Sequence, residues 1–305
     1  MIVPLFRLSF LSTTLALAGC ALQPAGIAQG NQRAMRLATW NLEHLAEANG
    51  QGCRPRTNAD YEVLRAHAER LSADVVAFQE VESEEAALRV FPSDQWTIVM
   101  SNRPANAREG ICRGTSGSKI RTQDTGFAIR KTVPFTRNAD LATLGLGNPD
   151  LRWGVDVTLN LPKPIRLLSV HLKSGCNINR DPKDRDCDIL FAQAPILEGW
   201  IDARASAGED FAVMGDWNRR TATAGEAFLG IVSDDDPPAG RLVFTNTGRG
   251  ATCIKRYPDF IDHIAVGGEA ARRLLPNSFV EYLYGVPEEL YPSDHCPSMV
   301  AVSAS

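Results

Sequence analysis

The sequence lacks an excess of positive charge, a long unbroken apolar segment and an internal repeat. Its formal net charge of -4 provides no basic footprint for tight, non-specific binding of duplex nucleic acid, so the composition favours a catalyst over a packaging protein. The apolar run from Leu8 to Ala18 is short and is interrupted by hydroxyl residues, which argues against a membrane-spanning helix. With 305 residues and 44% hydrophobic content, the chain can bury a large core and is expected to form one large domain.

The chain also lacks any Cys-x-x-Cys pair, although it has seven cysteines. Without such pairs a zinc site is disfavoured. Apart from Cys20, the cysteines are scattered: Cys53, Cys112, Cys176, Cys187, Cys253 and Cys296. An even number in an oxidising compartment indicates disulfides. Six cysteines allow about fifteen pairings, and we expect Cys176–Cys187 first because both lie in one polar loop, 174–188.

The N-terminal segment has the features of an export signal. Arg7 precedes the apolar run, and Leu17-Ala18-Gly19-Cys20 resembles the lipobox of bacterial lipoproteins. We therefore predict a lipoprotein signal peptide at 1–19, lipidation of Cys20, and a flexible tether at 20–33. An ordinary secretory signal with an incidental cysteine is the alternative. Both place the catalytic domain, 34–305, outside the cytoplasm, and the lipobox places it in the cell envelope, lipid-anchored in the outer membrane or periplasm.

Periodicity predicts many strands and few helices in mixed order. Apolar or alternating runs predict strands at 35–41, 75–78, 96–100, 125–130, 152–159, 165–171, 211–214 and 299–302, with another ending at 259–264. Helical spacing predicts helices at 61–71, 82–91 and 189–203, the last kinked or begun by Pro195. This combination indicates two stacked sheets flanked by helices, with loops that gather functional groups at one edge.

Polar side chains end or follow many of these strands. The set comprises Asn41, Glu80, His171, Asp216, Asn218, Asp262, Asp294 and His295. Burying such groups is costly unless they satisfy one another or a ligand. A phosphate ester requires this mixture, because its oxygens need hydrogen-bond donors while the attacking water and a cation need carboxylates.

Several short motifs occur in the order typical of one family. They are Trp40-Asn41, Gln79-Glu80, Ser169-Val170-His171-Leu172, Gly215-Asp216-Trp217-Asn218, Ile261-Asp262-His263-Ile264 and Ser293-Asp294-His295-Cys296-Pro297. Together they resemble the endonuclease/exonuclease/phosphatase superfamily of pancreatic-type deoxyribonucleases, abasic-site endonucleases, neutral sphingomyelinases and inositol polyphosphate phosphatases. The resemblance implies an α/β fold of the DNase I-like type, a four-layer α/β sandwich in which two mixed β-sheets pack face to face with helices outside.

The resemblance also implies catalytic roles. Glu80, with Asp294 nearby, would hold a divalent cation, Mg²⁺ or alternatively Mn²⁺ or Ca²⁺, because hard carboxylate oxygens suit these ions. Asp262 would orient His295 for proton exchange during in-line attack of water on phosphorus. Asp216 is the competing base, and the sequence leaves the choice between His295 and Asp216 open.

Other matched positions would bind the substrate phosphate. Asn41, Asn218 and His171 would donate hydrogen bonds to the phosphoryl oxygens, where negative charge develops. The resemblance to the deoxyribonuclease pattern implies Asp124 as the acid that pairs with His171. Arg152 resembles the arginine that reaches the scissile phosphate, although the usual proline after it is replaced.

One motif separates the branches of the superfamily. Abasic-site repair enzymes carry a tyrosine in an Asn-x-Tyr-x-Pro context where this chain has His171-Leu172-Lys173, and export also disfavours repair. The leading prediction is an exported, metal-dependent phosphodiesterase that acts on nucleic acid as a monomer, held at the membrane only by its lipid. The alternatives are a sphingomyelinase-type phospholipid or sugar-phosphate phosphoesterase, and an inactive surface-binding lipoprotein of the same fold.

Overall fold

The computed structural model describes residues 34–305 except 106–109, 115–116, 182 and 223–224. The predicted signal peptide at 1–19, the tether at 20–33 and the lipidation site Cys20 lie outside the described residues. None of the described helices is long and apolar enough to cross a membrane.

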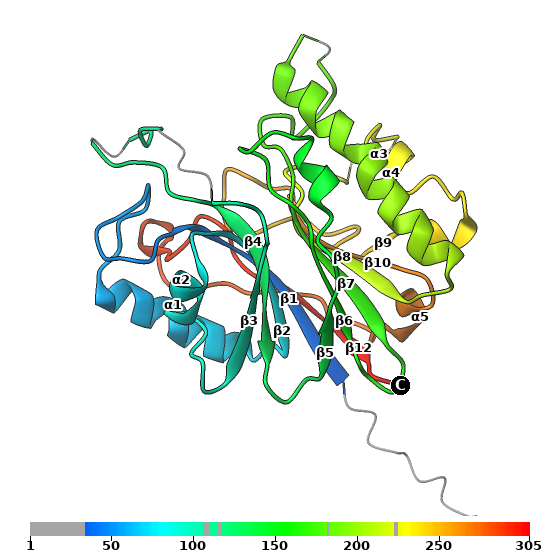
Figure 1. The fold of residues 1–305 in the computed structure, drawn as a ribbon, viewed down its shortest axis with the longest axis horizontal. Coiled ribbons are helices and arrows are strands. Elements are labelled where there is room, and N and C mark those ends of the chain that lie inside the picture. Colours follow the sequence, from blue (N-terminus) through cyan, green and yellow to red (C-terminus); the bar gives the residue numbers. More distant parts are fainter. Residues whose placement is uncertain (1–33, 106–109, 115–116, 182, 223–224) are drawn as a thin grey trace, which may run out of the picture. The chain divides into compact units, whose positions relative to one another are not determined.

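Two mixed six-stranded sheets form the fold (Figure 1). The first sheet, in the order β11-β12-β1-β2-β4-β3, contains β1 (Ala34–Leu45), β2 (Val75–Val81), β3 (Trp96–Met100), β4 (Asp124–Arg130), β11 (Val280–Glu281) and β12 (Ser298–Ser303). The second sheet, in the order β5-β6-β7-β8-β10-β9, contains β5 (Phe135–Arg137), β6 (Val155–Leu159), β7 (Ile165–His171), β8 (Phe211–Asp216), β9 (Val243–Phe244) and β10 (Asp262–Gly267). The pairs β1–β2 and β7–β8 are parallel, and the other described pairs are antiparallel.

Helices cover the outer face of each sheet. Figure 1 shows α1 (Asn58–Leu71) and α2 (Glu84–Leu88) beside the first sheet, and α3 (Arg185–Ser206) and α4 (Leu229–Val232) beside the second. The remaining helical segments are α5 (Ala270–Arg273) and the 3₁₀ turns η1 (Ala142–Gly145), η2 (Pro238–Gly240) and η3 (Glu288–Leu290). The layers therefore run helix, sheet, sheet, helix, which confirms the predicted α/β sandwich.

The strands are apolar on both faces because each sheet separates two cores. In β1, Leu37 packs between the sheets together with Met214 of β8, whereas Trp40 packs toward Leu64 of α1. Sheets covered on both sides favour continuous apolar runs over strict alternation. Each fully buried aliphatic or aromatic side chain in these cores contributes about 1.5–3 kcal/mol.

Several element bounds differ from those that the sequence predicts. The 259–264 segment was expected to end a strand, yet β10 begins at Asp262. Because β10 is antiparallel to β8, its first residue rather than its last reaches the edge where β8 ends. In α3, Asp184 caps the N-terminus by accepting a hydrogen bond from Asp186 N, so the helix begins at Arg185 and Pro195 lies within it rather than at its start. The short strands β5, β9 and β11 were not predicted.

Candidate active site

The predicted functional side chains meet at one edge of the two sheets, called here the functional edge. Asn41 and Glu80 lie on the parallel pair β1–β2, and His171 and Asp216 lie on the parallel pair β7–β8. Contacts between the sheets join them, because Asn41 Nδ2 lies 3.1 Å from Asp216 Oδ2 and His171 Nε2 lies 3.8 Å from Glu80 Oε1. Asp262, at the start of β10, pairs in register with Asp216. The fold therefore brings residues far apart in the chain into one cluster.

The backbone is irregular at this edge. The β1–β2 register shifts after Asn41, and Glu80, Glu43 and His44 have positive φ values of 62°, 43° and 52°. Left-handed backbone is costly for residues other than glycine and concentrates at functional sites. The irregularity brings Glu43 and His44 to the functional edge, where the sequence analysis missed them. The signal that could have found them is the polar pair following Asn41-Leu42.

The Glu80 carboxylate is held on one side and open on the other. Its Oε2 accepts hydrogen bonds from His44 N at 3.0 Å and from Gln123 Nε2 at 2.9 Å. Burial acts to raise its pKa, but His171 and His44 in their protonated forms, together with the permanent charge of Arg152, lower the pKa of Glu80 to about 2. Its Oε1 accepts no hydrogen bond within the described part of the chain. An ionised hard-oxygen donor with one free oxygen fits Mg²⁺ or Ca²⁺.

Asp294 and Glu80, the two predicted metal ligands, both lie near His44. Burial lowers the pKa of His44, while both carboxylates act to raise it. Asp294 is held through its backbone N, which donates to Glu43 Oε2 at 2.9 Å. Burial and the Asp294 carboxylate raise the pKa of Glu43. The neighbourhood is thus rich in carboxylate oxygen.

His295 and Asp262 form a close polar pair in the site. His295 Nδ1 lies 2.7 Å from Asp262 Oδ2, while Nε2 lies 3.9 Å from Asp216 Oδ2 and 3.8 Å from Asp294 Oδ1. Burial opposes the charged ring, but the surrounding carboxylates, led by Asp262, raise the pKa of His295 well above its usual range. The pairing leaves Nε2 as the edge of the ring that can meet a substrate.

Asp216 is buried among donors and acids. Its Oδ2 accepts a hydrogen bond from the Asn41 amide, and its Oδ1 accepts a hydrogen bond from Asn218 N at 2.8 Å. Burial, followed by the Asp262 carboxylate, raises the pKa of Asp216 to about 7. Among the described residues, Asp216, Asp262 and His295 also form a group whose ligand atoms lie within 4.8 Å of one another and could hold a metal.

The prediction that Asp124 pairs with His171 is wrong. Asp124 Oδ1 lies 2.6 Å from Arg103 Nε, because a permanent cation is a better partner for a carboxylate than a neutral ring. His171 Nε2 faces Glu80 and lies 3.5 Å from Asp216 Oδ2. Burial, and then Arg152, lower the pKa of His171 well below 6.5, so the ring is neutral near pH 7.

The other predicted phosphate ligands surround the same cluster. Arg152, which precedes β6, donates to Gln123 Oε1 at 2.8 Å, and Gln123 in turn donates to Glu80. Asn218, with φ of 51°, donates its amide to Leu172 O at 3.1 Å. An amide nitrogen carries two N–H groups, so the bonds of Asn41 and Asn218 each leave one N–H uncommitted among the described residues.

Two further residues, which no sequence motif indicated, hold the segment 291–297, which carries Asp294 and His295 and is called here the catalytic loop. Arg56 is buried and donates to Leu42 O and Pro292 O, each at 2.9 Å. Tyr284 donates to His295 O and accepts from Trp40 Nε1. No sequence signal distinguishes Arg56 or Tyr284 from surface residues of the same type.

The structure contains three disulfides, Cys53–Cys112, Cys176–Cys187 and Cys253–Cys296. The predicted pair Cys176–Cys187 is confirmed. Cys296 follows His295 directly, so the third disulfide joins the catalytic loop to the segment that precedes β10.

Comparisons with known proteins agree with this architecture. The sequence profile of the Endonuclease/Exonuclease/phosphatase family matches residues 38–295. No curated protein matches the chain in sequence.

Similar solved structures include the AP endonuclease LMAP from Leishmania major, with a TM-score of 0.58 and 16% identity, covering 89% of this chain and 88% of that one. TDP2 from C. elegans has a TM-score of 0.57 and 14% identity, covering 88% and 75%. The human nocturnin catalytic domain with bound sulfate has a TM-score of 0.56 and 14% identity, covering 88% and 94%. At these identities the likeness shows the fold alone.

Proposed function

The chain belongs to the endonuclease/exonuclease/phosphatase family, whose members hydrolyse phosphate esters, and on this premise we propose that it is an exported, divalent-metal-dependent phosphodiesterase acting on nucleic acid. The observation that carries the proposal is the Asp262–His295 pair, whose free Nε2 faces Asp216 beside the Glu80 carboxylate. This arrangement combines a cation ligand, an oriented imidazole and a buried acid.

The cation is proposed to bind at Glu80 with Asp294. The open Oε1 of Glu80 and the carboxylate of Asp294, both near His44, would form a hard-oxygen donor set. Such a set suits Mg²⁺, or alternatively Mn²⁺ or Ca²⁺. A bound divalent cation would neutralise charge on the phosphoryl group and orient it. The group formed by Asp216, Asp262 and His295 is assigned to proton transfer instead, because the short His295–Asp262 bond already occupies one of its ligand atoms.

Asp216 is proposed as the general base and His295 as the group that donates to phosphate. Three carboxylates within 3.9 Å of the His295 ring nitrogens favour its charged form, and a charged imidazole has no lone pair with which to accept a proton. Asp216 Oδ2 would then take the proton from the attacking water, while His295 Nε2 donates to a phosphoryl or leaving oxygen. Asp262 holds the ring in place.

The remaining cluster is proposed to bind the phosphate. Asn41 and Asn218 each have an uncommitted amide N–H, and Arg152 supplies a fixed positive charge. The neutral His171 ring supplies one N–H donor. Donors arranged before the reaction stabilise the charge that develops on the phosphoryl oxygens without reorganising.

Two features support export and a nucleic-acid substrate. Disulfides persist in oxidising compartments, and three of them are present. One similar structure is an AP endonuclease, which supports phosphodiester chemistry, although export and His171 disfavour a repair role. The intact cluster argues against the inactive-lipoprotein alternative.

A substrate screen tests the proposal. The full chain would be assayed with DNA, RNA, sphingomyelin and sugar phosphates, with Mg²⁺, Mn²⁺ and Ca²⁺ added separately and the His295→Ala variant as the background. Metal-dependent cleavage of DNA or RNA is expected. Preferred cleavage of sphingomyelin or a sugar phosphate would replace the nuclease proposal, and no cleavage above the variant would favour the inactive alternative.

A further inference from the structure

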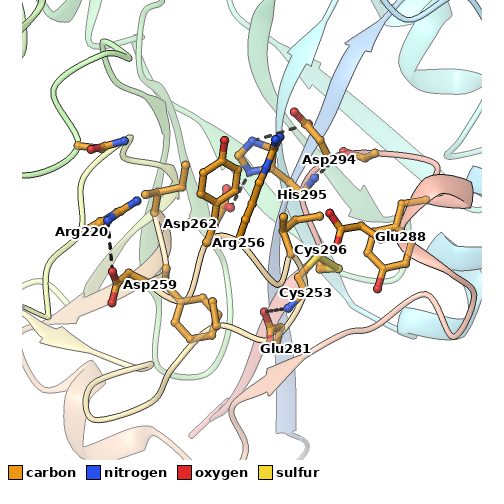
Figure 2. A pocket seen from close by; sticks show the side chains of 18 of the residues that line it. Arg220, Cys253, Arg256, Asp259, Asp262, Glu281, Glu288, Asp294, His295 and Cys296 are labelled. Atoms are coloured by element: carbon orange, nitrogen blue, oxygen red, sulfur yellow. Dashed lines mark hydrogen bonds and ion pairs between the residues drawn. A yellow bond between two sulfur atoms is a disulfide. The ribbon is translucent and has the colours of Figure 1, made fainter.

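A cavity opens beside the catalytic loop, next to the residues assigned to the reaction. Its volume is 450 Å³, within the range of about 300–1,000 Å³ typical of ligand pockets. His295 and Asp294 line one side, and residues of the segment 253–262 line another (Figure 2). A group in this cavity would lie next to a phosphate at the functional edge.

The wall of this cavity is attached to His295 at both ends. The wall segment, 253–262, begins at Cys253, whose disulfide partner Cys296 adjoins His295. It ends at Asp262, which contacts His295 Nδ1 at 2.7 Å. Glu281 holds the start of the segment by accepting a hydrogen bond from Cys253 N at 3.0 Å. A ligand on this wall would therefore have a fixed position relative to the reacting phosphate.

The wall presents an exposed tyrosine with an arginine over its ring. Tyr257 is 48% exposed, and Arg256 Cζ lies 4.7 Å from the centre of its ring. In Figure 2 the Arg256 side chain extends toward the side of the pocket where His295 and Asp294 lie. Covering an exposed aromatic ring with a second planar group is stabilising. A ring next to the proposed catalytic site can therefore bind a planar part of a substrate.

Arg256 also differs from the other arginines of the cavity. Arg220 pairs with Asp259 at 3.4 Å, and Arg54 pairs with Glu43 at 3.2 Å. Within the described residues, Arg256 has no carboxylate partner. Its planar guanidinium therefore keeps its hydrogen-bond donors for a ligand while its face stacks on the tyrosine.

These features favour one class of occupant. A nucleobase is planar, neutral and rich in acceptors, so it can stack on the Tyr257–Arg256 pair and accept from the guanidinium. A lipid chain would desolvate the charged side chains that line much of the cavity. A quaternary ammonium would find aromatic rings and carboxylates, but it would also meet the unpaired charge of Arg256.

We propose that this pocket binds the nucleoside attached to the scissile phosphate, with its base against Tyr257 and Arg256. The inference rests on the proposed phosphodiesterase function, because it assigns the substrate class of that site. Comparing the binding of a 3′-nucleotide with that of a 5′-nucleotide will show on which side of the scissile phosphate the nucleoside lies.

Calorimetry on the full chain with Mg²⁺ tests the pocket. The probes are adenosine 5′-monophosphate, adenosine 3′-monophosphate, phosphocholine and inorganic phosphate. At least one adenosine monophosphate is expected to bind about tenfold or more tightly than inorganic phosphate, since stacking of a base has an effect of this size. Arg256→Ala and Tyr257→Ala should each remove most of that difference. The matched control is Arg204→Ala, which removes an arginine lying over Trp200 of α3, outside the pocket.

Hydrolysis of bis(p-nitrophenyl) phosphate, measured in parallel, separates the two proposals. If this ester is hydrolysed but neither nucleotide binds more tightly than inorganic phosphate, the nucleoside pocket is wrong while the phosphodiesterase proposal stands. Tighter binding of phosphocholine, lost in the same two variants, would reassign the pocket to a choline headgroup. If no phosphodiester is hydrolysed with any cation, the phosphodiesterase proposal is wrong, whether or not the nucleotides bind.

Discussion

The amide of Asn41 donates a 3.1 Å hydrogen bond to Oδ2 of Asp216, which lies 175 residues later in the chain and in the other sheet. The bond crosses between the sheets at the functional edge and is buried. It fixes Asp216 relative to Glu80, because Asn41 and Glu80 lie on neighbouring strands of the first sheet. The relative position of the two sheets therefore determines the distance between the proposed metal ligand and the proposed base.

Divalent cations should be required for hydrolysis. Glu80→Gln is expected to lose the response to added Mg²⁺, because the neutral amide is a weaker ligand for a hard cation. Initial rates would be measured after exhaustive chelation and then across a titration of each metal. The matched control is Glu82→Gln, whose carboxylate pairs with Arg121 instead. Full activity after chelation would contradict the metal proposal.

The protein recovered from membranes should carry lipid on Cys20 and expose no free thiol. The three disulfides account for the other six cysteines. Intact-mass analysis should show the lipid, and alkylation should label thiols only after reduction. Cys20→Ser should be released from the membrane with its disulfides unchanged. An unmodified Cys20, or several thiols labelled without reduction, would be incompatible with the anchor.

The sequence predicted the location of a functional residue where that residue lies at the end of a buried strand. Parallel neighbours end at the same edge, so Asn41 could be expected to lie near Glu80 in one sheet, and His171 near Asp216 in the other. The position of Asp262 was also informative, although its strand begins there rather than ends. In these cases a buried strand and a short polar motif specify the location together.

The sequence was uninformative where a loop supplies the partner. Arg103 reaches Asp124 from the irregular segment between β3 and β4, which has no periodicity to predict its path. Glu43 and His44 reach the site only because β1 becomes irregular after Asn41. Such features depend on tertiary contacts, and no local pattern encodes them.

Removing the Cys253–Cys296 disulfide should affect catalysis as well as stability. The double variant Cys253→Ser/Cys296→Ser is expected to lose about 2–4 kcal/mol of unfolding free energy. It should also lower kcat by about tenfold to a hundredfold, because misplacing His295 slightly is costly. Denaturant unfolding and steady-state kinetics would be measured. Cys53→Ser/Cys112→Ser is the control, and an equal kcat loss there would show that the effect is not specific to the catalytic loop.

Asp262 and His295 should act as one unit. Asp262→Asn and His295→Ala are each expected to lower kcat by roughly a hundredfold to ten-thousandfold. The double variant should be little slower than the slower single variant, because both side chains serve one proton transfer. Full additivity of the two losses in log kcat would show that they act independently.

The pH dependence of kcat/KM should distinguish the proposed base from the proposed donor. Below about pH 7 the Asp216 carboxyl is protonated, because burial and then Asp262 raise its pKa to about 7. A protonated carboxyl cannot accept a proton from water, so the rate should rise as the pH increases through about 7. Asp216→Asn should be much slower and lose this rise.

The His295→Ala variant should hydrolyse substrate slowly, yet its kcat/KM should still rise with pH. The midpoint of that rise should shift. The charge of His295 acts to lower the pKa of Asp216, so removing that charge should shift the midpoint to higher pH. The profile of His295→Ala therefore reports the pKa of a carboxylate that has lost a cationic neighbour. If His295→Ala abolished the rise while Asp216→Asn kept it, the imidazole would be the base, and the roles of these two residues would be reversed.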